Sequence, residues 1–456
     1  MAVMYQSPGV YQETVFVKPQ APLTTGIPAF VGFAEAITPL AALPGELILS
    51  DLPQALQARL QHNPRTQQLS FKGVMTAAQQ QALLAVIPAA TVATPPSPAW
   101  SAYRAAILTL AQWAQPIVAL RRPEEFAQHY ATDQSYLQSA IAGFFENGGE
   151  TCYLSRADKT TVSSTQALIA AISQLTDFEH TDVIAVPDAV PRSPVNASLD
   201  LAAIAAVQHA LIQHCQDQQD CFALIDALPN SSPADVLQQR QTLLANQSAD
   251  SPVNGALYYP WVVNDQGQAV PPCGHIAGVI ARCDRTRGVF KAPANELLKD
   301  VQSLTAPVDA AVQNQLNPVG INCIRPLPGR GIRVFGARTL SENPTWRYIS
   351  TRRLFITLRR WIDRQMIWAT FEPNGPRLWI RIQRELSAHL TQLWREGALQ
   401  GAAASEAFFV KCDAETNPPE QRELGQVQTE VGLAVTHPAE FLIMRITQRP
   451  NETEVT

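Results

Sequence analysis

The stretches "DVIAVPD" at residues 182–188 and "CFALIDAL" at residues 221–228 decide the fold class. Both are short apolar runs of strand length, and two more runs of this kind occur at 151–157 and 256–263. Segments with the spacing of amphipathic helices separate them, for example "STQALIAAISQL". Strands that alternate with helices are typical of a parallel sheet covered by helices. We therefore predict an α/β layer with a largely parallel sheet over residues 130–265.

Length and composition restrict the class of protein. The chain has 456 residues, 46% of them apolar, which favours two or three globular domains. No apolar run approaches the roughly 18–20 residues needed to cross a bilayer, and the start "MAVMYQSPGVYQE" does not resemble a signal peptide. The seven cysteines are odd in number and scattered, which favours reduced thiols in the cytoplasm over a disulfide framework.

The N-terminal third contains an arm, a linker and an insertion. Residues 8–17 are predicted to form a short strand, followed by a Pro/Gly/Thr linker at 18–28 that should be extended and able to move. Such an arm cannot fold alone and needs a partner sheet. Residues 45–125 are predicted to form a small surface module with a strand, a helix capped by Thr76, and a second helix near 101–114.

The C-terminal region is helical, basic and ends in a strand. Two amphipathic stretches, 348–371 and 377–399, are separated by the break "EPNGP", and "PAEFLIMRIT" at 438–447 is a predicted strand. Residues 325–395 contain fourteen arginines but only four acidic residues, although the whole chain has a net charge of −5. This asymmetry predicts a basic face that meets an acidic partner.

Two aspartates are the first candidates for chemistry. Asp188 and Asp226 follow putative parallel strands, and the carboxyl ends of such strands are where doubly wound sheets bind ligands. However, neither is accompanied by a glycine-rich phosphate loop. Capping of the strand end and turn formation are therefore the favoured interpretation.

The histidines and cysteines give little support for a metal site or a nucleophile. The residues considered are His209, His214, Cys215, Cys221, Cys273, His275 and Cys283. His209 and His214 are five apart, whereas two metal ligands on one helix face are four apart. Cys215 and Cys221 lack the close spacing of a zinc knuckle, and no fourth ligand accompanies the last three residues. Cys273 has no recognisable general base or oxyanion hole. We expect no metal, no cofactor and no catalysis.

The arginine-rich helices have three interpretations besides a solvated face. Dense positive charge suits nucleic acid, but Trp361, Trp368, Trp379 and Trp394 are interleaved with the spacing of core residues. An acidic protein surface is the second interpretation. In the third, some of the arginines are paired inside the fold with carboxylates and carbonyls.

Several motifs, in this order along the chain, resemble the contractile tail sheath proteins. The matching segments are "SPGVYQE" at 7–13, "GFFENGGETCYLSR" at 143–156, "YYPWVV" at 258–263, "PPCGHIAGVIARCDRTRGVFKAPAN" at 271–295, "LNPVGINCIRP" at 316–326, "VFGARTL" at 334–340, "WRYISTRRL" at 346–354, "FEPN" at 371–374 and "PAEFLIMRI" at 438–446. The chain is most similar to the sheaths of extracellular contractile injection systems of the antifeeding prophage and Photorhabdus virulence cassette type. The resemblance covers the N-terminal arm and nearly everything after residue 130, and it is absent from 45–125.

The resemblance implies a tail-sheath fold of α/β (α+β overall) class. Its implied parts are an N-terminal arm and the start of an inner domain at 1–35, an inserted module at 45–125, an outer α/β domain at 130–270, and an inner domain with a C-terminal arm at 271–456. In this family both arms add strands to sheets of neighbouring subunits. The implied arm residues are Val10, Tyr11, Gln12, Glu13, Thr14 and Val15, and Phe441, Leu442, Ile443, Met444, Arg445 and Ile446.

The implied function is mechanical. Subunits form a helical sheath of stacked rings around an inner tube, and the sheath contracts to drive the tube through a target envelope while linkers at 18–28 and 434–438 act as hinges. We expect part of the arginine face to contact an acidic inner tube. The expected contact residues are Arg352, Arg353, Arg359, Arg360 and Arg364.

The resemblance also implies the partners and the location. The expected partners are copies of the same chain, an inner tube protein, baseplate and cap proteins, and sheath paralogues. Nucleic acid and direct membrane insertion are not expected. Assembly is expected in the bacterial cytoplasm, as part of a phage tail-like particle. The alternatives left open are a minor, baseplate-proximal sheath paralogue, an α/β metal-dependent hydrolase that uses Asp188 or Asp226, and a nucleic-acid-binding protein.

Overall fold

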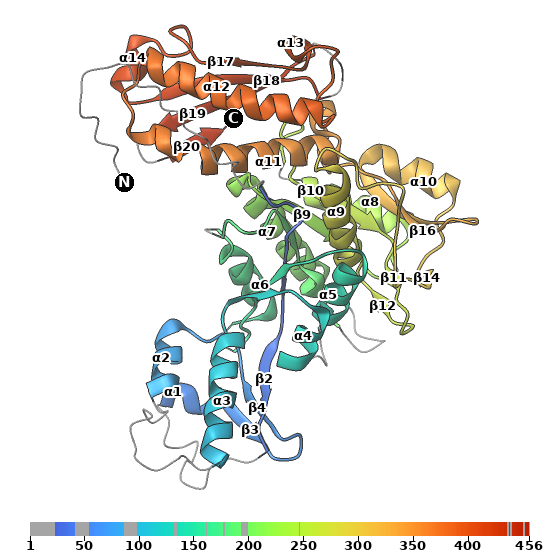
Figure 1. Ribbon diagram of the computed structural model, residues 1–456. Helices are drawn as coiled ribbons and strands as arrows, with labels where there is room; N and C mark the ends of the chain where they lie inside the picture. Colours follow the sequence, from blue (N-terminus) through green and yellow to red (C-terminus); the bar gives the residue numbers. More distant parts are fainter. Residues whose placement is uncertain are drawn as a thin grey trace, which may run out of the picture.

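The structure is a computed structural model of the whole chain. It describes residues 23–41, 54–85, 98–131, 135–160, 162–176, 178–192, 199–245, 247–435, 437, 440–449 and 452–455. The predicted N-terminal arm at 10–15 lies outside these residues, as does part of the predicted hinge at 434–438. Three units follow one another in space: an N-terminal lobe, a central α/β layer and a C-terminal unit (Figure 1).

The central layer is built on a nine-stranded sheet with the order β13-β16-β15-β10-β9-β8-β1-β7-β5. Its strands are β1 (Pro28–Gly32), β5 (Ile117–Leu120), β7 (Cys152–Arg156), β8 (Val183–Ala185), β9 (Phe222–Asp226), β10 (Gly255–Tyr259), β13 (Glu296–Leu297), β15 (Ile321–Leu327) and β16 (Gly331–Phe335). The six strands from β15 to β7 run parallel, and the antiparallel pairings lie at the two edges. This confirms the predicted largely parallel sheet.

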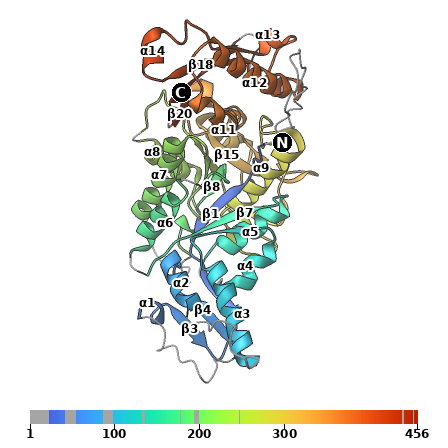
Figure 2. The same ribbon diagram turned by 60° about the vertical axis from the view of Figure 1, so that its left-hand side comes forward.

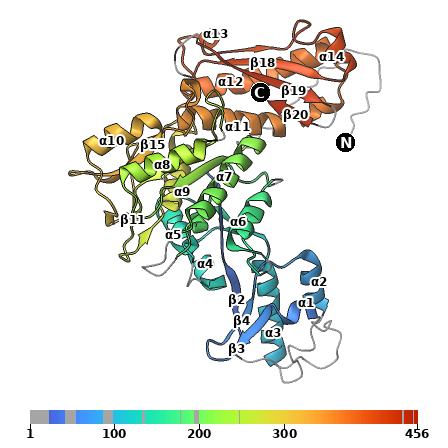
Figure 3. The same ribbon diagram turned by 180° about the vertical axis from the view of Figure 1, so that it is seen from behind.

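Helices cover both faces of this sheet (Figures 1 and 3). The helices are α5 (Leu137–Glu146) and α9 (Cys273–Arg287) on one face, and α6 (Ser164–Ser173), α7 (Leu201–Gln218), α8 (Pro233–Leu244) and α10 (Ala310–Leu316) on the other. The side chains of β1 alternate between the two layers, because Phe30 joins one hydrophobic cluster while Ala29 and Val31 join the other. The predicted domain boundary at residue 270 does not coincide with this layer, since α9, β15 and β16 belong to it.

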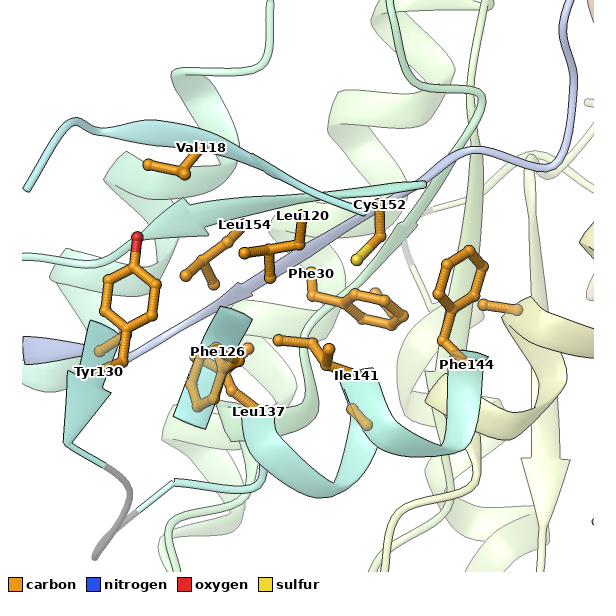
Figure 4. Close-up of a cluster of buried hydrophobic side chains, with 14 of the residues drawn as sticks. Phe30, Val118, Leu120, Phe126, Tyr130, Leu137, Ile141, Phe144, Cys152 and Leu154 are labelled. Carbon is orange, nitrogen blue, oxygen red and sulfur yellow. The ribbon is translucent and has the colours of Figure 1, made fainter. Parts of the chain in front are cut away.

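The cluster between the sheet and α5 is dense and apolar. Figure 4 shows Phe30, Ile141, Phe144 and Leu154 converging there from β1, α5 and β7, all at most 1% exposed. Helix α9 lies beside α5 on the same face of the sheet and packs against it at backbone distance: a Cβ added to Gly274 would lie 2.1 Å from the carbonyl oxygen of Ala140. The small residues of α9 therefore allow the two helices to pack closely.

The N-terminal lobe interrupts the chain between β1 and β7. Its four-stranded sheet has the order β3-β4-β2-β6. Its elements are β2 (Glu35–Pro39), α1 (Gln54–Gln57), β3 (Leu60–Asn63), β4 (Gln68–Phe71), α2 (Ala77–Ala85), α3 (Pro98–Trp113), α4 (Pro123–His129) and β6 (Tyr130–Ala131). The predicted Thr76 cap is confirmed by the hydrogen bond from Gln79 N to Thr76 Oγ1. The lobe therefore spans more than the predicted module, and it projects away from the C-terminal unit (Figure 2).

A buried arginine fastens this lobe to the central sheet. Arg156, at the end of β7, is 0% exposed. It donates to the carbonyl oxygens of Ala34 at 2.9 and 2.7 Å, Gly73 at 2.6 Å and Gln115 at 3.4 Å. One guanidinium thus satisfies three carbonyl groups at the root of the lobe.

The C-terminal unit packs two long helices on one face of a second sheet. Its elements are α11 (Ile349–Gln365), α12 (Pro376–Arg395), α13 (Ala404–Ala407), β17 (Phe408–Lys411), α14 (Pro419–Glu423), β18 (Val427–Leu433), β19 (Leu442–Arg449) and β20 (Glu452–Val455). The four strands pair in sequence order, all antiparallel. The two predicted amphipathic helices and the break between them are confirmed.

Smaller elements complete the described chain. Strands β11 (Val262–Val263), β12 (Ala269–Val270) and β14 (Ser303–Leu304) form a short three-stranded sheet beside the central layer. Among the described residues, no helix has both the length and the apolarity to cross a membrane.

Candidate functional site at the junction of the central sheet and the C-terminal unit

Helix α11 lies across the amino ends of three parallel strands of the central sheet. The loop that precedes each of these strands accepts a hydrogen bond from one arginine of this helix. Arg353 Nη2 donates to Asp182 before β8 at 2.7 Å, and Arg359 Nη1 donates to Gln219 before β9 at 2.5 Å. Arg352 Nε donates at 2.5 Å to Asn254, which precedes β10. The arginines of α11 therefore join the C-terminal unit to the central layer.

Asp182 is the centre of this junction. Its Oδ2 accepts the backbone N–H of Gly26 at 3.0 Å, and its Oδ1 accepts that of Ile27 at 2.7 Å. Oδ2 also lies 2.7 Å from Nη2 of Arg353, and the two side chains are 2% and 3% exposed. One carboxylate thus holds the linker that leads into β1 and the helix that begins the C-terminal unit.

A second carboxylate completes the ion cluster from α9. Arg353 Nη1 and Nη2 donate to the two oxygens of Asp284 at 2.8 and 2.7 Å. Burial alone would lower the pKa of Arg353, but the charges of Asp284 and Asp182 raise it above its ordinary value. Burial raises the pKa of Asp284 even though the guanidinium opposes the shift. The arginine therefore stays charged, and its ion pairs with the carboxylates offset the cost of burying these groups.

The linker meets α9 at backbone distance. Gly26 has a φ of +71°, and a Cβ there would lie 2.6 Å from Cα of Ala281. The hydroxyl of Thr25 also bonds to Asp284. Residues 25–27 are therefore fixed to the central layer, so that the last part of the predicted 18–28 hinge is held in place.

A second cluster lies further along α11. Arg360 Nη2 and Arg364 Nη2 both donate to the carbonyl oxygen of Glu179, at 2.8 and 2.6 Å. Burial raises the pKa of Asp363 to about 6, with Arg359 opposing the shift. The loop before β8 is thus bonded at two points to the same helix.

These contacts correct the expected inner-tube surface. Arg352, Arg353 and Arg360 are 7%, 3% and 5% exposed, so they cannot form a face for another protein. Arg359 and Arg364 also have partners in the central layer. The interpretation of internal pairing is confirmed, because each guanidinium finds an acceptor that precedes a strand of the sheet.

Asp188 and Asp226 lie where the sequence predicted, at the carboxyl edge of the sheet, but both are enclosed. Asp188 is 5% exposed and accepts hydrogen bonds from Phe33 N, Tyr136 N and Ser135 Oγ at 2.7–2.8 Å. Asp226 is 8% exposed and accepts from Cys273 N at 2.9 Å. Burial raises the pKa of Asp188 to about 6 and that of Asp226 to about 7. The cavity beside Asp226 is about 10 Å³, room for one water molecule. Both aspartates link loops and a helix end.

The histidines and cysteines considered above are not brought together as a metal site. No group of three metal-ligating side chains occurs among the residues that the structure describes. His275 is 0% exposed, and burial lowers its pKa to about 4. It packs against Gly143 of α5, where an added Cβ would lie 2.6 Å from the imidazole ring. It is therefore a packing residue of the α5–α9 contact.

The residues predicted as the C-terminal arm lie in or next to β19. Leu442 to Ile446 pair antiparallel with Leu433 to Thr429 of β18 in the same chain. Pairing with another copy stays a prediction. The Asp182–Arg353–Asp284 cluster was not predicted, because no local pattern joins residues that are 69 and 171 positions apart.

Comparison with known proteins agrees with this architecture. The family models described as "Phage tail sheath protein central domain" and "Phage tail sheath C-terminal domain" match residues 161–340 and 341–449. The chain belongs to the tail sheath family. The division at 340/341 falls just before α11, where the cluster at Asp182 joins the two units.

This sheath protein is similar to protein chains from structures of contractile particles. It is 27% identical to a chain of the anti-feeding prophage helical sheath in the contracted state, with a TM-score of 0.60 over 96% of this chain and 98% of that one. A chain of the anti-feeding prophage baseplate is 26% identical, with a TM-score of 0.57 and the same coverage. The tail sheath protein of Vibrio phage KVP40 is 28% identical over 159 residues, which are 34% of this chain and 23% of that protein.

Proposed function

We propose that this protein is a structural sheath subunit of a contractile injection system, which polymerises around an inner tube and contracts to drive that tube through a target envelope. The observation that carries the proposal is the likeness to the contracted anti-feeding prophage sheath over nearly the full length of both chains. Negative-stain microscopy of the pure protein tests it. Hollow helical sheaths are expected, and a protein that stays monomeric at high concentration would contradict it.

Subunits connect by strand exchange in this proposal. The N-terminal arm, Val10 to Val15, adds a strand to the C-terminal sheet of a neighbour. Phe441 to Ile446 form the second arm, for which β19 must leave β18 of its own chain and pair in another copy. In the single chain, β17 and β20 are the edge strands of this sheet, and an edge strand offers unpaired backbone groups to another chain. Deletion of residues 1–17 should leave a folded monomer that does not polymerise. Normal sheaths from the deletion variant would refute arm exchange.

The inner tube contacts the outer face of α12 in this proposal, in place of α11. Arg377, Arg381, Arg384 and Arg395 are all exposed on this helix. Exposed ion pairs contribute about 1 kcal/mol or less each, which suits a contact that must release. Arg377→Glu with Arg384→Glu should reduce loading onto purified tube. The control is Arg104→Glu with Arg121→Glu, two exposed arginines of the N-terminal region. Equal loading of both double variants would exclude α12.

A baseplate-proximal sheath paralogue is the second candidate, because one similar chain comes from an anti-feeding prophage baseplate. Quantitative mass spectrometry of purified particles separates the two roles. A main sheath subunit is far more abundant than the baseplate proteins, whereas a paralogue confined to one ring matches them in copy number.

We also infer that the role is structural rather than enzymatic. The former hydrolase candidates Asp188 and Asp226 are enclosed, and their carboxylates are bonded to backbone N–H groups. Assembly in the cytoplasm, from reduced subunits, is part of the same proposal. Particles with Asp226→Asn should contract as fully as the wild type.

A further inference from the structure

One face of the outermost strands of the central sheet is open to solvent. Arg333 of β16 lies directly opposite Arg325 of β15, and Leu297 of β13 lies opposite Arg333 on the other side. Phe335 is two positions from Arg333, so it points to the same face of the sheet. Val334, on the other face, is 0% exposed, whereas Phe335 is 36% exposed and Leu297 is 39% exposed. We call Arg325, Arg333, Phe335 and Leu297 the hairpin face.

The two arginines of the hairpin face have no anionic partner in their own subunit. Arg325 Nε donates to the carbonyl oxygen of Val308 at 3.3 Å, and Arg333 Nη1 donates to that of Asn295 at 2.6 Å. Among the residues that the structure describes, neither arginine forms an ion pair with a carboxylate. Like charges directly opposite each other in a sheet destabilise the pair of strands. An acidic partner on this face would remove that repulsion.

The composition of the hairpin face is that of a protein interface. The guanidinium carbon of Arg325 lies 5.4 Å from the ring centroid of Phe335. Arginine and aromatic side chains are enriched where protein interfaces bind most strongly, and exposed apolar side chains beside them add area to bury. The face therefore suits a partner that presents both carboxylates and an apolar side chain.

The chain itself carries such a surface, on helix α14. Glu420 and Glu423 are three positions apart and Leu424 is four positions after Glu420, so that all three lie on one side of the helix. The glutamates are exposed, and Leu424 is 68% exposed, more than any other large apolar side chain that the structure describes. Arg422 lies elsewhere, with its guanidinium carbon 5.8 Å from the ring centroid of Trp379. We call Glu420, Glu423 and Leu424 the α14 face.

We propose that the hairpin face of one subunit binds the α14 face of a second copy of this chain. The two arginines pair with the two glutamates, and the apolar side chains of the hairpin face cover Leu424. Neither glutamate has an ion-pair partner among the described residues of its own chain, so both carboxylates are available.

The positions of the two faces allow this contact to repeat. The β15–β16 hairpin and α14 lie on opposite sides of the molecule (Figures 1 and 3). A contact between two different surfaces is heterologous, so each subunit still offers one free face after binding, and the series continues. The role of this contact within a sheath rests on the proposed function. Exposed ion pairs are individually weak and are screened by salt, so the contact supplements the arm strands.

Reversal of the charges tests the pairing. Arg325→Glu with Arg333→Glu should weaken the association of copies by about tenfold or more, because attraction becomes repulsion. Glu420→Arg with Glu423→Arg should weaken it to a similar extent. The chain with all four changes should recover most of the association, since both faces then exchange sign. Sedimentation equilibrium measures this for the free chain, and the lowest concentration at which sheaths form measures it for the assembly.

Controls separate the contact from effects on folding or net charge. Arg104→Glu with Arg121→Glu changes the net charge by the same amount at exposed positions of the N-terminal region, and it should associate like the wild type. Thermal melts of each variant show whether it folds. The α14 variant changes only exposed side chains, so it tests the contact even if the hairpin variant is unstable.

Cross-linking locates the contact directly. Arg333→Lys keeps the positive charge and adds an amine that a carbodiimide can join to a neighbouring carboxylate. In a mixture of heavy-isotope-labelled and unlabelled chains, we expect peptides that join position 333 of one copy to Glu420 or Glu423 of the other. The link should form in the concentrated free chain and in assembled sheaths, and it should be absent when Glu420→Gln and Glu423→Gln are added.

The possible results distinguish this contact from the proposed function. Sheaths that form without the link, or a chain with four changes that associates no better than the two double variants, would overturn the contact and leave the sheath function standing. A link from position 333 to another protein of the particle would also overturn it. Linked copies of a chain that never forms sheaths would uphold the contact and contradict the proposed function.

Discussion

The replacement of Arg353 by methionine tests whether the cluster at Asp182 holds the two units together. The variant keeps most of the side-chain volume but removes the only cation bonded to Asp182 and Asp284 among the described residues. Three charge-assisted hydrogen bonds of 2.7–2.8 Å are lost, and two carboxylates that are each 2% exposed stay behind unpaired. Removal of one partner from a buried ion pair typically costs about 3–5 kcal/mol. We expect a loss of stability of this size at pH 7.

The assay should resolve the separate units, since a protein of several domains need not unfold in one step. Hydrogen exchange reports the amides of Gly26 and Ile27 directly, together with helix α11. We expect faster exchange at these sites by about two orders of magnitude or more, as each 1.4 kcal/mol is a factor of ten. Arg384→Met, at an exposed arginine of α12, is the control and should change stability by less than about 0.5 kcal/mol.

Two further results would refute the reasoning about Arg353. The first is exchange at Gly26 and Ile27 that is unchanged in the variant. The second is a double variant that is no more stable than the single one. Asp284→Asn in the Arg353→Met background should recover part of the lost stability, because it removes one of the two carboxylate charges that have no cation. The loss should also shrink as the pH falls and the carboxyls take up protons. A deficit that is independent of pH would show that packing, and not charge, was lost.

Three further predictions concern other sites. Asp226→Asn should stabilise the protein at pH 8 by about 2–4 kcal/mol. The pKa of Asp226 in the folded protein, about 7, lies above the ordinary value of 3.8, so the stability of the wild type falls as the pH rises from about 4 to 7. Equal urea midpoints of variant and wild type at pH 8 would contradict this. Gly26→Ala should lower the melting temperature of the protein more than Gly267→Ala does. Both glycines have φ near +71°, but only at Gly26 would an added Cβ meet another atom within 4 Å, the backbone of Ala281. Equal losses would show that the contact with Ala281 is unimportant. Arg156→Met leaves the carbonyl groups of Ala34, Gly73 and Gln115 without the guanidinium donor. The N-terminal lobe should then become sensitive to proteases, while α11 and α12 stay protected. A lobe as resistant as that of the wild type would show that Arg156 does not fasten it.

The central sheet could be predicted because its strands are buried on both faces. All five residues of β9 and of β10 are buried, and such strands appear in a sequence as short continuous apolar runs between helices. The Thr76 cap was predictable as well, since a threonine hydroxyl directly before a helix accepts a hydrogen bond from one of the first backbone N–H groups of that helix. Both features depend on residues close together in the chain.

The junction could not be predicted because charge alone does not show where a side chain points. The arginines of α11 indicated a basic face for an acidic partner, and their partners are the loops before β8, β9 and β10 of the same chain. The central layer also continues past the predicted domain boundary at residue 270. The prolines at 271 and 272 directly precede a helix that covers the sheet, and β15 extends that sheet beyond them.

The N-terminal lobe has a consequence for how such particles diversify. The segment from β2 to α3, which forms most of the lobe, leaves the sheet after Gly32 of β1 and returns to it at Ile117 of β5. Gly32 lies beside Arg156 and Ile117 beside Ser155 of the same strand, β7, so this segment starts and ends near one point of the sheet. It lies at the end of the molecule opposite the C-terminal unit (Figures 1 and 2). Evolution or an engineer can therefore exchange it as a cassette for a tag, an adhesin or a shorter loop. The strands and helices that bear the load of contraction would keep their order.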